Sequence, residues 1–199
     1  MLRFIIALLI LRVKPTITLF APVVRRFRVK PWDLDLNIHL NNAKYLKYLD
    51  KGRVEHIINC HPIRQLYHRQ YKLIVANTEI SYIRSLLPFQ PFSVASKITG
   101  WDHKYVYYEQ RFESQGQLYA IAVIRLALLK GNTTTSPVPV FEQLTGMPTG
   151  PELPGSVQLF NQLIRAQRQE SSTTKSTAIH QEQPDHPPTL ETPKIKESL

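Results

Sequence analysis

The sequence predicts an α+β fold in which one long central helix is wrapped by a curved antiparallel sheet of about five strands. Three observations support this prediction. An alternating strand pattern comes first, a helical pattern of ~19 residues follows it, and four segments rich in Val, Ile, Tyr and Phe complete the ordered region. A strand, a long helix and then a meander of strands can close a sheet around the helix.

The first strand and the helix are marked by their side-chain periods. Arg25 to Trp32 alternates basic and apolar residues, as a half-buried strand does. The helix begins near Asn41, which can act as N-cap, and Leu40 and Tyr45 occupy the two positions of a hydrophobic staple. Gly52 lies inside the helix at a cost of about 1 kcal/mol relative to Ala, so we expect another backbone to approach there. Pro62 closes the segment.

The later strands are separated by Pro, Gly and Asp residues. Because these joints are short, we expect neighbouring strands to pair in antiparallel fashion. The predicted strands are Leu73 to Leu87, Phe92 to Thr99, Tyr105 to Glu113 and Leu118 to Leu129.

The composition divides the chain into three parts. Residues 1–23 form an apolar and basic segment, residues 24–168 form the folded domain with a C-terminal helical extension, and residues 169–199 are expected to be a disordered tail because they hold few large apolar residues.

The N-terminal segment is predicted to associate with a membrane. Phe4 to Leu11 is an apolar run, too short for the ~20 residues of a transmembrane helix. A basic cluster from Arg25 to Lys30 would hold the domain at the inner, cytoplasmic face of the membrane. The alternative is a segment that packs on the domain itself.

Charge and cysteine content exclude some classes of protein. The net charge is +10, but residues 1–30 carry seven basic residues and no acidic one, so the excess is local. No recognition motif accompanies it, and a nucleic-acid partner is therefore not expected. Cys60 is the one cysteine, which rules out an intrachain disulfide and agrees with a reducing compartment.

The candidate chemistry lies between Asp33 and Asn42, where a strand gives way to a helix. If Asn41 caps the helix, the N–H of Asn42 is left without an intrahelical acceptor and can stabilise an oxyanion. Asp35, a few residues upstream, can then activate water or attack a carbonyl directly.

Simpler interpretations of these residues remain open. Asp35 can equally serve only to cap a turn, and His39 only to orient the loop. A metal site built from Asp33, Asp35 and His39 lacks matching ligands elsewhere, so no metal is expected. Cys60 and His61 resemble a dyad, but sequence neighbours rarely meet productively.

Several motifs together resemble a known family. The pattern Asp35-x-x-x-His39-x-Asn41-Asn42 continues with Asp50-x-Gly52-Arg53, and further matches are Leu87-Pro88-Phe89-Gln90, Gly100-Trp101-Asp102-x-Lys104 and Tyr108-x-Gln110-Arg111-Phe112. These motifs, over about residues 25–130, resemble the 4-hydroxybenzoyl-CoA thioesterase-like group of the hotdog superfamily, in its D-L-D-x-N-x-H-x-N-N branch.

The resemblance implies a hotdog-fold acyl-CoA thioesterase that needs no metal or organic cofactor. It implies that Asp35 is the nucleophile or general base, that the Asn42 backbone amide polarises the thioester carbonyl, and that His39 supports them. Asn41 and Tyr45 are expected beside the substrate. The resemblance also implies a homodimer or higher oligomer. Many relatives carry Gly where this chain has Ile38, a change that can reshape the loop.

A second functional hypothesis is a non-catalytic hotdog protein that binds acyl chains or serves as an assembly module. Both hypotheses share the same fold signals, and only a measured activity separates them.

Overall fold

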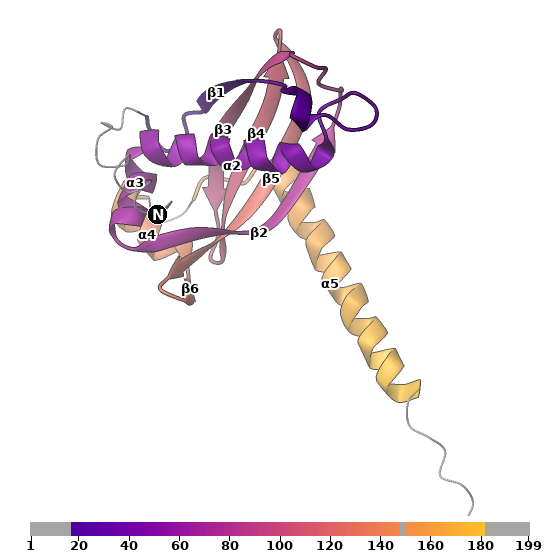
Figure 1. The fold of residues 1–199 in the computed structure, drawn as a ribbon. Helices are drawn as coiled ribbons and strands as arrows, with labels where there is room; N and C mark the ends of the chain where they lie inside the picture. Colours follow the sequence, from indigo (N-terminus) through magenta and orange to yellow (C-terminus); the bar gives the residue numbers. More distant parts are fainter. Residues whose placement is uncertain (1–16, 148–149, 182–199) are drawn as a thin grey trace, which may run out of the picture. The chain divides into compact units, whose positions relative to one another are not determined.

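The computed structural model describes residues 17–147 and 150–181 of the 199-residue chain. Contacts divide the chain into two units, with the boundary between Phe160 and Asn161. The first unit contains a six-stranded antiparallel sheet and the long helix that the sheet wraps (Figure 1). The predicted α+β architecture with one central helix is therefore confirmed.

The sheet is built from strands in the order β1-β3-β4-β5-β2, and β6 pairs with β5. The strands are β1 (Val23–Arg28), β2 (Tyr71–Tyr82), β3 (Pro91–Trp101), β4 (Tyr105–Ser114), β5 (Gln117–Lys130) and β6 (Thr133–Thr135).

The expectation that β2 pairs with its successor β3 was wrong. The strand predicted to run to Leu87 ends at Tyr82, and the residues after it form a connection long enough to reach the other side of the sheet. β2 therefore pairs with β5, and β3 pairs with β1. This crossover places the end of β2 near the start of the central helix, where the hydroxyl of Tyr82 donates to the Asn42 carbonyl at 3.5 Å.

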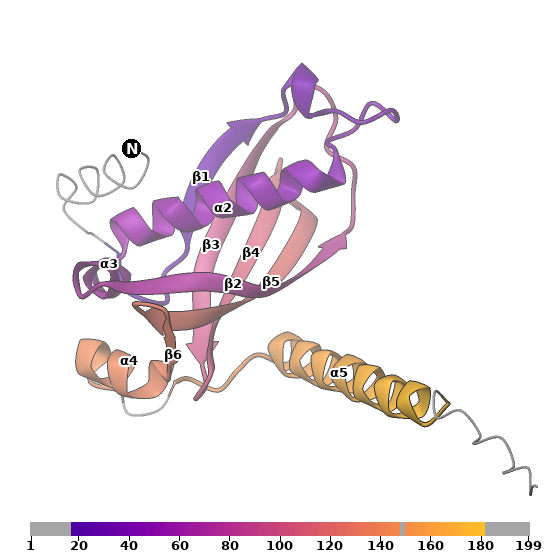
Figure 2. The ribbon, with the colours of Figure 1, turned by 60° about the horizontal axis from the view of Figure 1, so that its bottom comes forward.

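The central helix is α2 (Asn42–Asn59), and Figure 2 shows it lying along the concave face of the sheet. It buries Tyr45, Tyr48, Leu49, Gly52 and His56. Cys60 interrupts the helical path, and α3 (His61–His68) follows with Pro62 in its first turn. The helix thus ends close to the predicted position.

Gly52 faces side chains rather than another backbone. A Cβ atom there would lie 2.6 Å from Ser96 Oγ and 2.8 Å from Gln110 Nε2. The Gln110 side chain donates to Ser96 Oγ at 2.7 Å and to the Leu49 carbonyl at 3.0 Å. A buried polar link between sheet and helix therefore occupies the space that the glycine leaves free.

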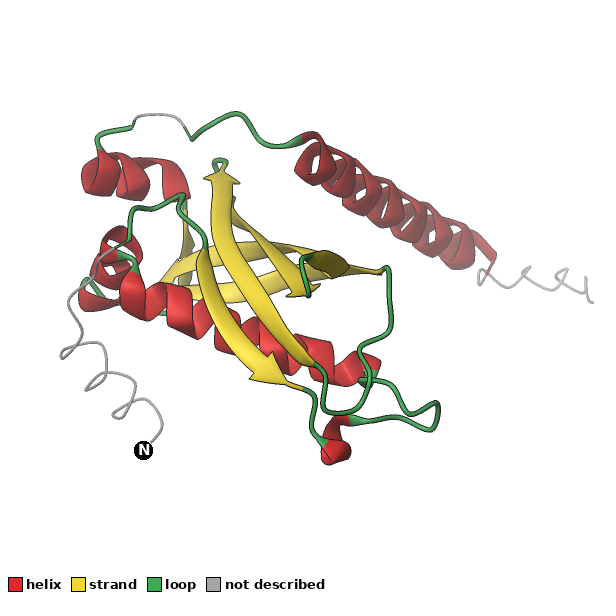
Figure 3. Cartoon of the chain, turned by 90° about the horizontal axis from the view of Figure 1, so that it is seen from above, coloured by secondary structure: helices red, strands yellow, loops and turns green. Residues whose placement is uncertain are grey.

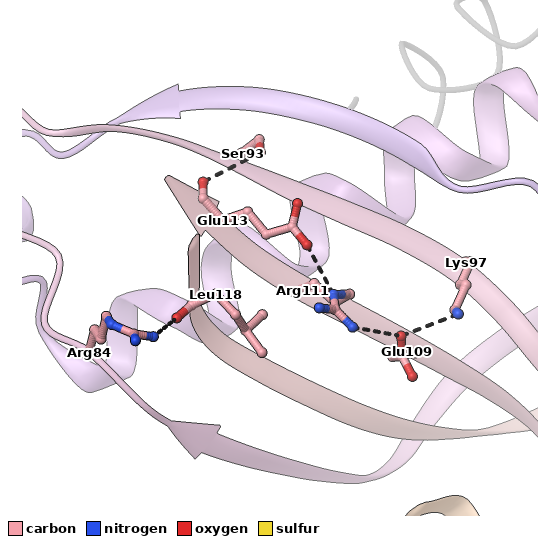
Figure 4. Close-up of polar contacts among 7 residues, drawn as sticks. All are labelled: Arg84, Ser93, Lys97, Glu109, Arg111, Glu113 and Leu118. Carbon is pink, nitrogen blue, oxygen red and sulfur yellow. Dashed lines mark hydrogen bonds and ion pairs between the residues drawn. The ribbon is translucent and has the colours of Figure 1, made fainter. Parts of the chain in front are cut away.

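The opposite face of the sheet carries paired charges. Figure 4 shows Glu109 between Lys97 and Arg111, with Arg111 also bound to Glu113. The residues alternating with them, such as Val94, Tyr108 and Phe112, are buried beneath α2. This alternation is the expected period of a strand with one solvated face.

Residues 17–23 pack on the domain. Leu19 belongs to the hydrophobic core, and the Ile17 N–H donates to the Asn59 carbonyl at 3.2 Å. The packed alternative therefore holds for this part of the predicted membrane segment, because its apolar side chains complete the core. Residues 1–16, with the Phe4 to Leu11 run, lie outside the described residues. Across residues 17–147 and 150–181, every helix is too short or too polar to cross a bilayer.

Two helices follow the sheet. The first is α4 (Pro137–Thr145), and the second is α5 (Gly155–Gln181). The helical extension continues beyond Arg168 into residues 169–181, for which we expected disorder. This stretch includes the helix-forming residues Gln, Glu, Lys and Ala. Residues 182–199 lie outside the described residues.

Candidate active site at the start of the central helix

The start of α2 is fixed by Asn41. Its side chain accepts a hydrogen bond from the Ala43 N–H at 2.9 Å, as predicted for an N-cap. Leu40 and Tyr45, the predicted staple pair, are both buried in the hydrophobic core. Asn42 is the first helical residue and has no intrahelical acceptor for its N–H. No hydrogen bond among the described residues uses this donor.

The loop before the helix holds itself together. The Asp35 N–H donates to the His39 carbonyl at 2.9 Å, and the Ile38 N–H returns to the Asp35 carbonyl at 3.1 Å. Asp35 Oδ1 accepts the N–H groups of Asn37 at 2.9 Å and His39 at 3.2 Å. One carboxylate oxygen of Asp35, Oδ1, is therefore used to shape the loop.

Ile38 is in the left-handed region of backbone space, with φ 59°. A β-branched residue rarely adopts this conformation, because its Cβ crowds the backbone. The loop therefore holds Ile38 in a strained backbone conformation.

Asp35, His39, Asn42 and Tyr45 come together around one pocket of about 330 Å³. The pocket lies at the junction of the loop, the first turn of α2 and the residues that follow β2. Its lining residues are Asp35, Asn37, His39, Leu40, Asn42, Tyr45, Tyr82, Ile83, Arg84 and Ser85. Asn41 is not among them, so the structure gives this predicted substrate-contacting residue a capping position instead.

Tyr45 and Tyr82 form an aromatic wall of the pocket, with ring centroids 4.9 Å apart in an edge-to-face arrangement. Burial raises the pKa of Tyr45 to about 12, and the neighbouring Tyr82 and Asp35 add to this effect. The phenol therefore stays neutral at physiological pH. It can offer a hydrogen-bond donor beside the carboxylate.

Asp33 lies outside the pocket and is structural. It is 5% exposed, accepts the Tyr48 hydroxyl at 2.6 Å and forms an ion pair with Lys44 at 3.2 Å. Burial acts to raise the pKa of Asp33, but the hydrogen bonds from Tyr48 and Lys44 outweigh burial and lower it. The Asp33 carbonyl also accepts the Asn41 N–H at 2.8 Å. Asp33 thus ties the loop to α2.

The contribution of four residues to the pocket was not predicted from the sequence: Tyr82, Ile83, Arg84 and Ser85. They were placed inside a strand predicted to continue to Leu87. The polar pair Arg84-Ser85 within an apolar run was the available sign that the strand had ended. Arg84, which lines the pocket, donates to the Leu118 carbonyl at 2.7 Å (Figure 4).

The Cys60-His61 pair does not form a dyad. Cys60 is fully buried, and burial raises the pKa of its thiol. His61 Nε2 instead contacts the side chain of Gln65 at 3.1 Å. Within the described parts of the chain, no group of three His, Cys, Asp or Glu side chains is placed to hold a metal ion.

A single long helix wrapped by an antiparallel sheet in the order β1-β3-β4-β5-β2, with a pocket at the helix N-terminus, defines a hotdog-fold protein. The chain belongs to the thioesterase-like superfamily, whose sequence model matches residues 29–169. This match includes the pocket, α2 and five of the six strands.

Two curated relatives illustrate the sequence similarity. Protein THEM6 of Danio rerio is 33% identical over 107 residues, which cover 53% of each chain. The long-chain acyl-CoA thioesterase FadM of Escherichia coli is 26% identical over 101 residues, which cover 50% of this chain and 76% of FadM. The chain spans about half the length of the THEM6 proteins of Danio rerio and Xenopus laevis that it matches.

Solved structures share the fold. YbaW, a probable thioesterase from Escherichia coli, superimposes with a TM-score of 0.57 at 20% identity, covering 61% of this chain and 94% of YbaW. A thioesterase from Thermus thermophilus, solved with coenzyme A and zinc, superimposes with a TM-score of 0.54 at 25% identity, covering 63% of this chain and 98% of that thioesterase.

Proposed function

We propose that this protein hydrolyses an acyl-CoA thioester to a carboxylic acid and free CoA, with Asp35 as the catalytic carboxylate. The observation that carries the proposal is that Asp35 and Asn42, the first residue of α2, line one pocket in a member of the thioesterase-like superfamily. The names of relatives agree with it, since FadM acts on long-chain acyl-CoA and the Thermus thermophilus structure contains coenzyme A.

The reaction begins when Asp35 removes a proton from a water molecule whose oxygen attacks the thioester carbonyl carbon. The carbonyl oxygen becomes an oxyanion, and the Asn42 N–H donates a hydrogen bond to it at the positive end of the α2 dipole. The C–S bond then breaks, the carbonyl reforms, and the proton held by Asp35 passes to the departing thiolate. Direct attack by the Asp35 carboxylate would form an anhydride that water cleaves to the same products.

The neighbouring residues have supporting roles. His39 fixes Asp35 through its N–H, which bonds Asp35 Oδ1 at 3.2 Å. Tyr45 closes the pocket beside the carboxylate and contacts the acyl chain. Asn41 positions the Asn42 amide by capping α2, because loss of the cap would let the first helical turn fray.

The activity is tested with purified full-length protein and a panel of acyl-CoA substrates from short to long chain, with free thiol as the readout. We expect turnover of medium or long acyl-CoA. Tight binding of acyl-CoA with no thiol release would favour the alternative, a non-catalytic acyl-binding protein. One observation favours this non-catalytic alternative: Asp35 Oδ1 accepts hydrogen bonds from the N–H groups of its own loop.

We also propose a homodimer formed through β2. This strand ends the sheet order, and its residues Ile74 and Val75 are 48% and 45% exposed. An apolar edge strand readily pairs with another copy of itself. Sedimentation of the wild-type protein should give a dimer, and Ile74→Lys should shift it toward monomer. A monomeric wild-type protein would contradict this proposal.

Membrane association of residues 1–16 is a further part of the proposed function, supported by the Phe4 to Leu11 run. Because Ile17 and Leu19 pack on the domain, a truncation that tests this should keep Ile17. Full-length protein should sediment with membranes and the truncated protein should stay in the supernatant. Equal partition of the two would contradict the role of this segment.

A further inference from the structure

Two loops lie together at the end of the domain where α2 begins. Residues 29–41 connect β1 to α2, and residues 83–90 connect β2 to β3; we call these two loops the rim. The Phe89 N–H donates to the Val29 carbonyl at 3.1 Å, the Val29 N–H to the Gln90 carbonyl at 3.0 Å, and the Leu40 N–H to the Leu86 carbonyl at 2.8 Å. Figure 3 shows the first loop, with its short 3₁₀ helix η1 (Pro31–Asp33), projecting beside the start of α2.

The rim exposes large apolar side chains. Exposed fractions range from 51% to 103% for Trp32, Leu36, Ile38, Leu87 and Phe89. Isolated exposed apolar residues are ordinary, but five of them on two bonded loops form a concentration that usually marks an interaction surface.

Two of these side chains are displayed from strained backbone. Ile38 has φ 59° and Phe89 has φ 60°, both in the left-handed region that non-glycine residues rarely adopt. Such strain persists where the surrounding structure enforces it, and it is concentrated at functional sites.

Positive charge surrounds these apolar residues. Lys30 lies 5.2 Å from the centre of the Trp32 ring, and Arg28 donates to the Phe89 carbonyl at 2.7 Å. Lys47 and Lys30 are close enough to Lys51 that, after burial, they act together to lower its pKa. Among the ion pairs of the described residues, neither Lys30 nor Lys47 has a carboxylate partner.

The nearby acids do not cancel this charge. Asp33 is buried and already paired with Lys44, and Asp35 faces the pocket. The outer face of the sheet differs, because Lys97 and Arg111 are paired there with Glu109 and Glu113. The rim therefore combines exposed aromatic and aliphatic side chains with a local excess of cations.

We propose that the rim docks this end of the domain on an anionic lipid bilayer. Trp32 enters the interfacial layer, where amphipathic aromatic rings are favoured, and the apolar ring of Phe89 is buried at the boundary between headgroups and acyl chains. Lys30 and Lys47 lie over the acidic headgroups. Docking brings the pocket that contains Asp35 to the membrane surface. Ile17 does not belong to this surface, since it lies at the other end of α2, against Asn59.

The tryptophans allow a direct test on the full-length protein without substrate. The chain has two of them, Trp32 at 69% exposure and Trp101 at 3%. Adding phosphatidylcholine–phosphatidylserine vesicles should shift Trp32 emission to the blue, and lipids brominated on their acyl chains should quench it. Pure phosphatidylcholine should produce little change. Raising the salt to about 1 M, where the Debye length is ~3 Å, should reverse the shift.

Variants separate the contributions of the rim. Trp32→Ser should abolish the vesicle-dependent emission change. The double variant Lys30→Gln and Lys47→Gln should bind the vesicles roughly thirtyfold more weakly, as measured by the emission titration. This is the effect expected for two lysines near anionic lipid, at about 1 kcal/mol each. The matched control, Val24→Ser with Lys104→Gln, removes an exposed apolar residue and a lysine away from the rim and should leave the emission titration unchanged.

Two results would overturn the proposal. Sedimentation with anionic vesicles and no change in Trp32 emission would place the membrane contact elsewhere, with residues 1–16 the first candidate. The second result is a blue-shifted Trp32 emission in the dimer without lipid that moves to the red when dilution produces monomer. This result would show that a second copy of the chain covers the rim. Thioester hydrolysis plays no part in this test, so its outcome is independent of the proposed activity.

Discussion

At the first position of α2, Asn42 has an N–H without an intrahelical acceptor, and Asn42 and Asp35 line the same pocket. Replacing Asn42 by proline removes this donor while keeping a residue that the first helical position accepts. Asn41, which would precede the proline, already has φ −59° and ψ 133°, a conformation that a residue before proline favours.

Asn42→Pro should therefore fold and lose about 10² to 10³ in kcat, the usual loss for one oxyanion donor. Asn42→Ala keeps the amide and serves as the control, with most of its activity retained. Thermal melts and acyl-CoA hydrolysis measure both effects. Wild-type kcat in a well-folded Asn42→Pro protein would mean that another group polarises the carbonyl.

Ile38 offers a test of strain in the same loop. Ile38→Gly should raise the free energy of unfolding by about 0.5–1 kcal/mol, because relief of a left-handed conformation worth ~1–2 kcal/mol exceeds the entropic cost of glycine. Leu36→Gly, at an exposed position where φ is not positive, should instead lower stability by about 0.5–1 kcal/mol. Urea unfolding compares the two. Equal losses in both variants would contradict the strain at Ile38.

At the scale of elements, α2 and the sheet are joined through the space above Gly52. Gly52→Ala gains about 1 kcal/mol of helix propensity, yet its Cβ would lie within 2.8 Å of both Ser96 Oγ and Gln110 Nε2. Overpacking of this kind costs about 1–3 kcal/mol, and we expect a net loss of stability in thermal melts. Combining the change with Ser96→Ala should recover part of the loss. A more stable Gly52→Ala protein would show that the polar link moves aside easily.

The start of α2 could be predicted from local sequence because an N-cap and its staple depend on neighbouring residues. Asn41 and the pair Leu40 and Tyr45 occupy their predicted places for this reason. The strand that pairs with β2 could not be predicted from local sequence, because this pairing depends on the path of the chain after Tyr82. Because the end of β2 was not predicted, the contribution of Arg84 to the pocket was not predicted either.

At the scale of the whole molecule, the pocket is assembled from segments about forty residues apart in the chain, such as Asn42 and Tyr82. The loop half of the pocket was predictable from one motif. The other half of the pocket, formed by the end of β2 and the residues after it, could be identified only from the three-dimensional fold. The pairing of β2 with β5 brings Tyr82 to the start of α2.

The buried core also predicts a pH dependence of stability. His56 is fully buried and hydrogen-bonded through Nδ1 to the Tyr108 hydroxyl at 2.9 Å, and burial lowers its pKa from 6.5 to about 4. Between these values the unfolded state binds more protons than the folded state. Stability therefore falls as the pH drops from about 6.5 to 4, by up to about 3 kcal/mol from this group. His56→Gln should flatten the dependence in urea unfolding, and an unchanged slope would exclude His56 as its source.

The central claim is that Asp35 carries out thioester hydrolysis, and one measurement tests it most directly. The kcat of Asp35→Asn is compared with that of the wild type on the best acyl-CoA substrate, with free thiol as the readout and thermal melts to establish folding. Asparagine keeps a side-chain oxygen that can accept the N–H groups of Asn37 and His39, so the loop should persist while the base is lost. We predict a fall in kcat of at least about 10² with little change in melting temperature. A folded Asp35→Asn protein with near wild-type kcat would contradict the assignment.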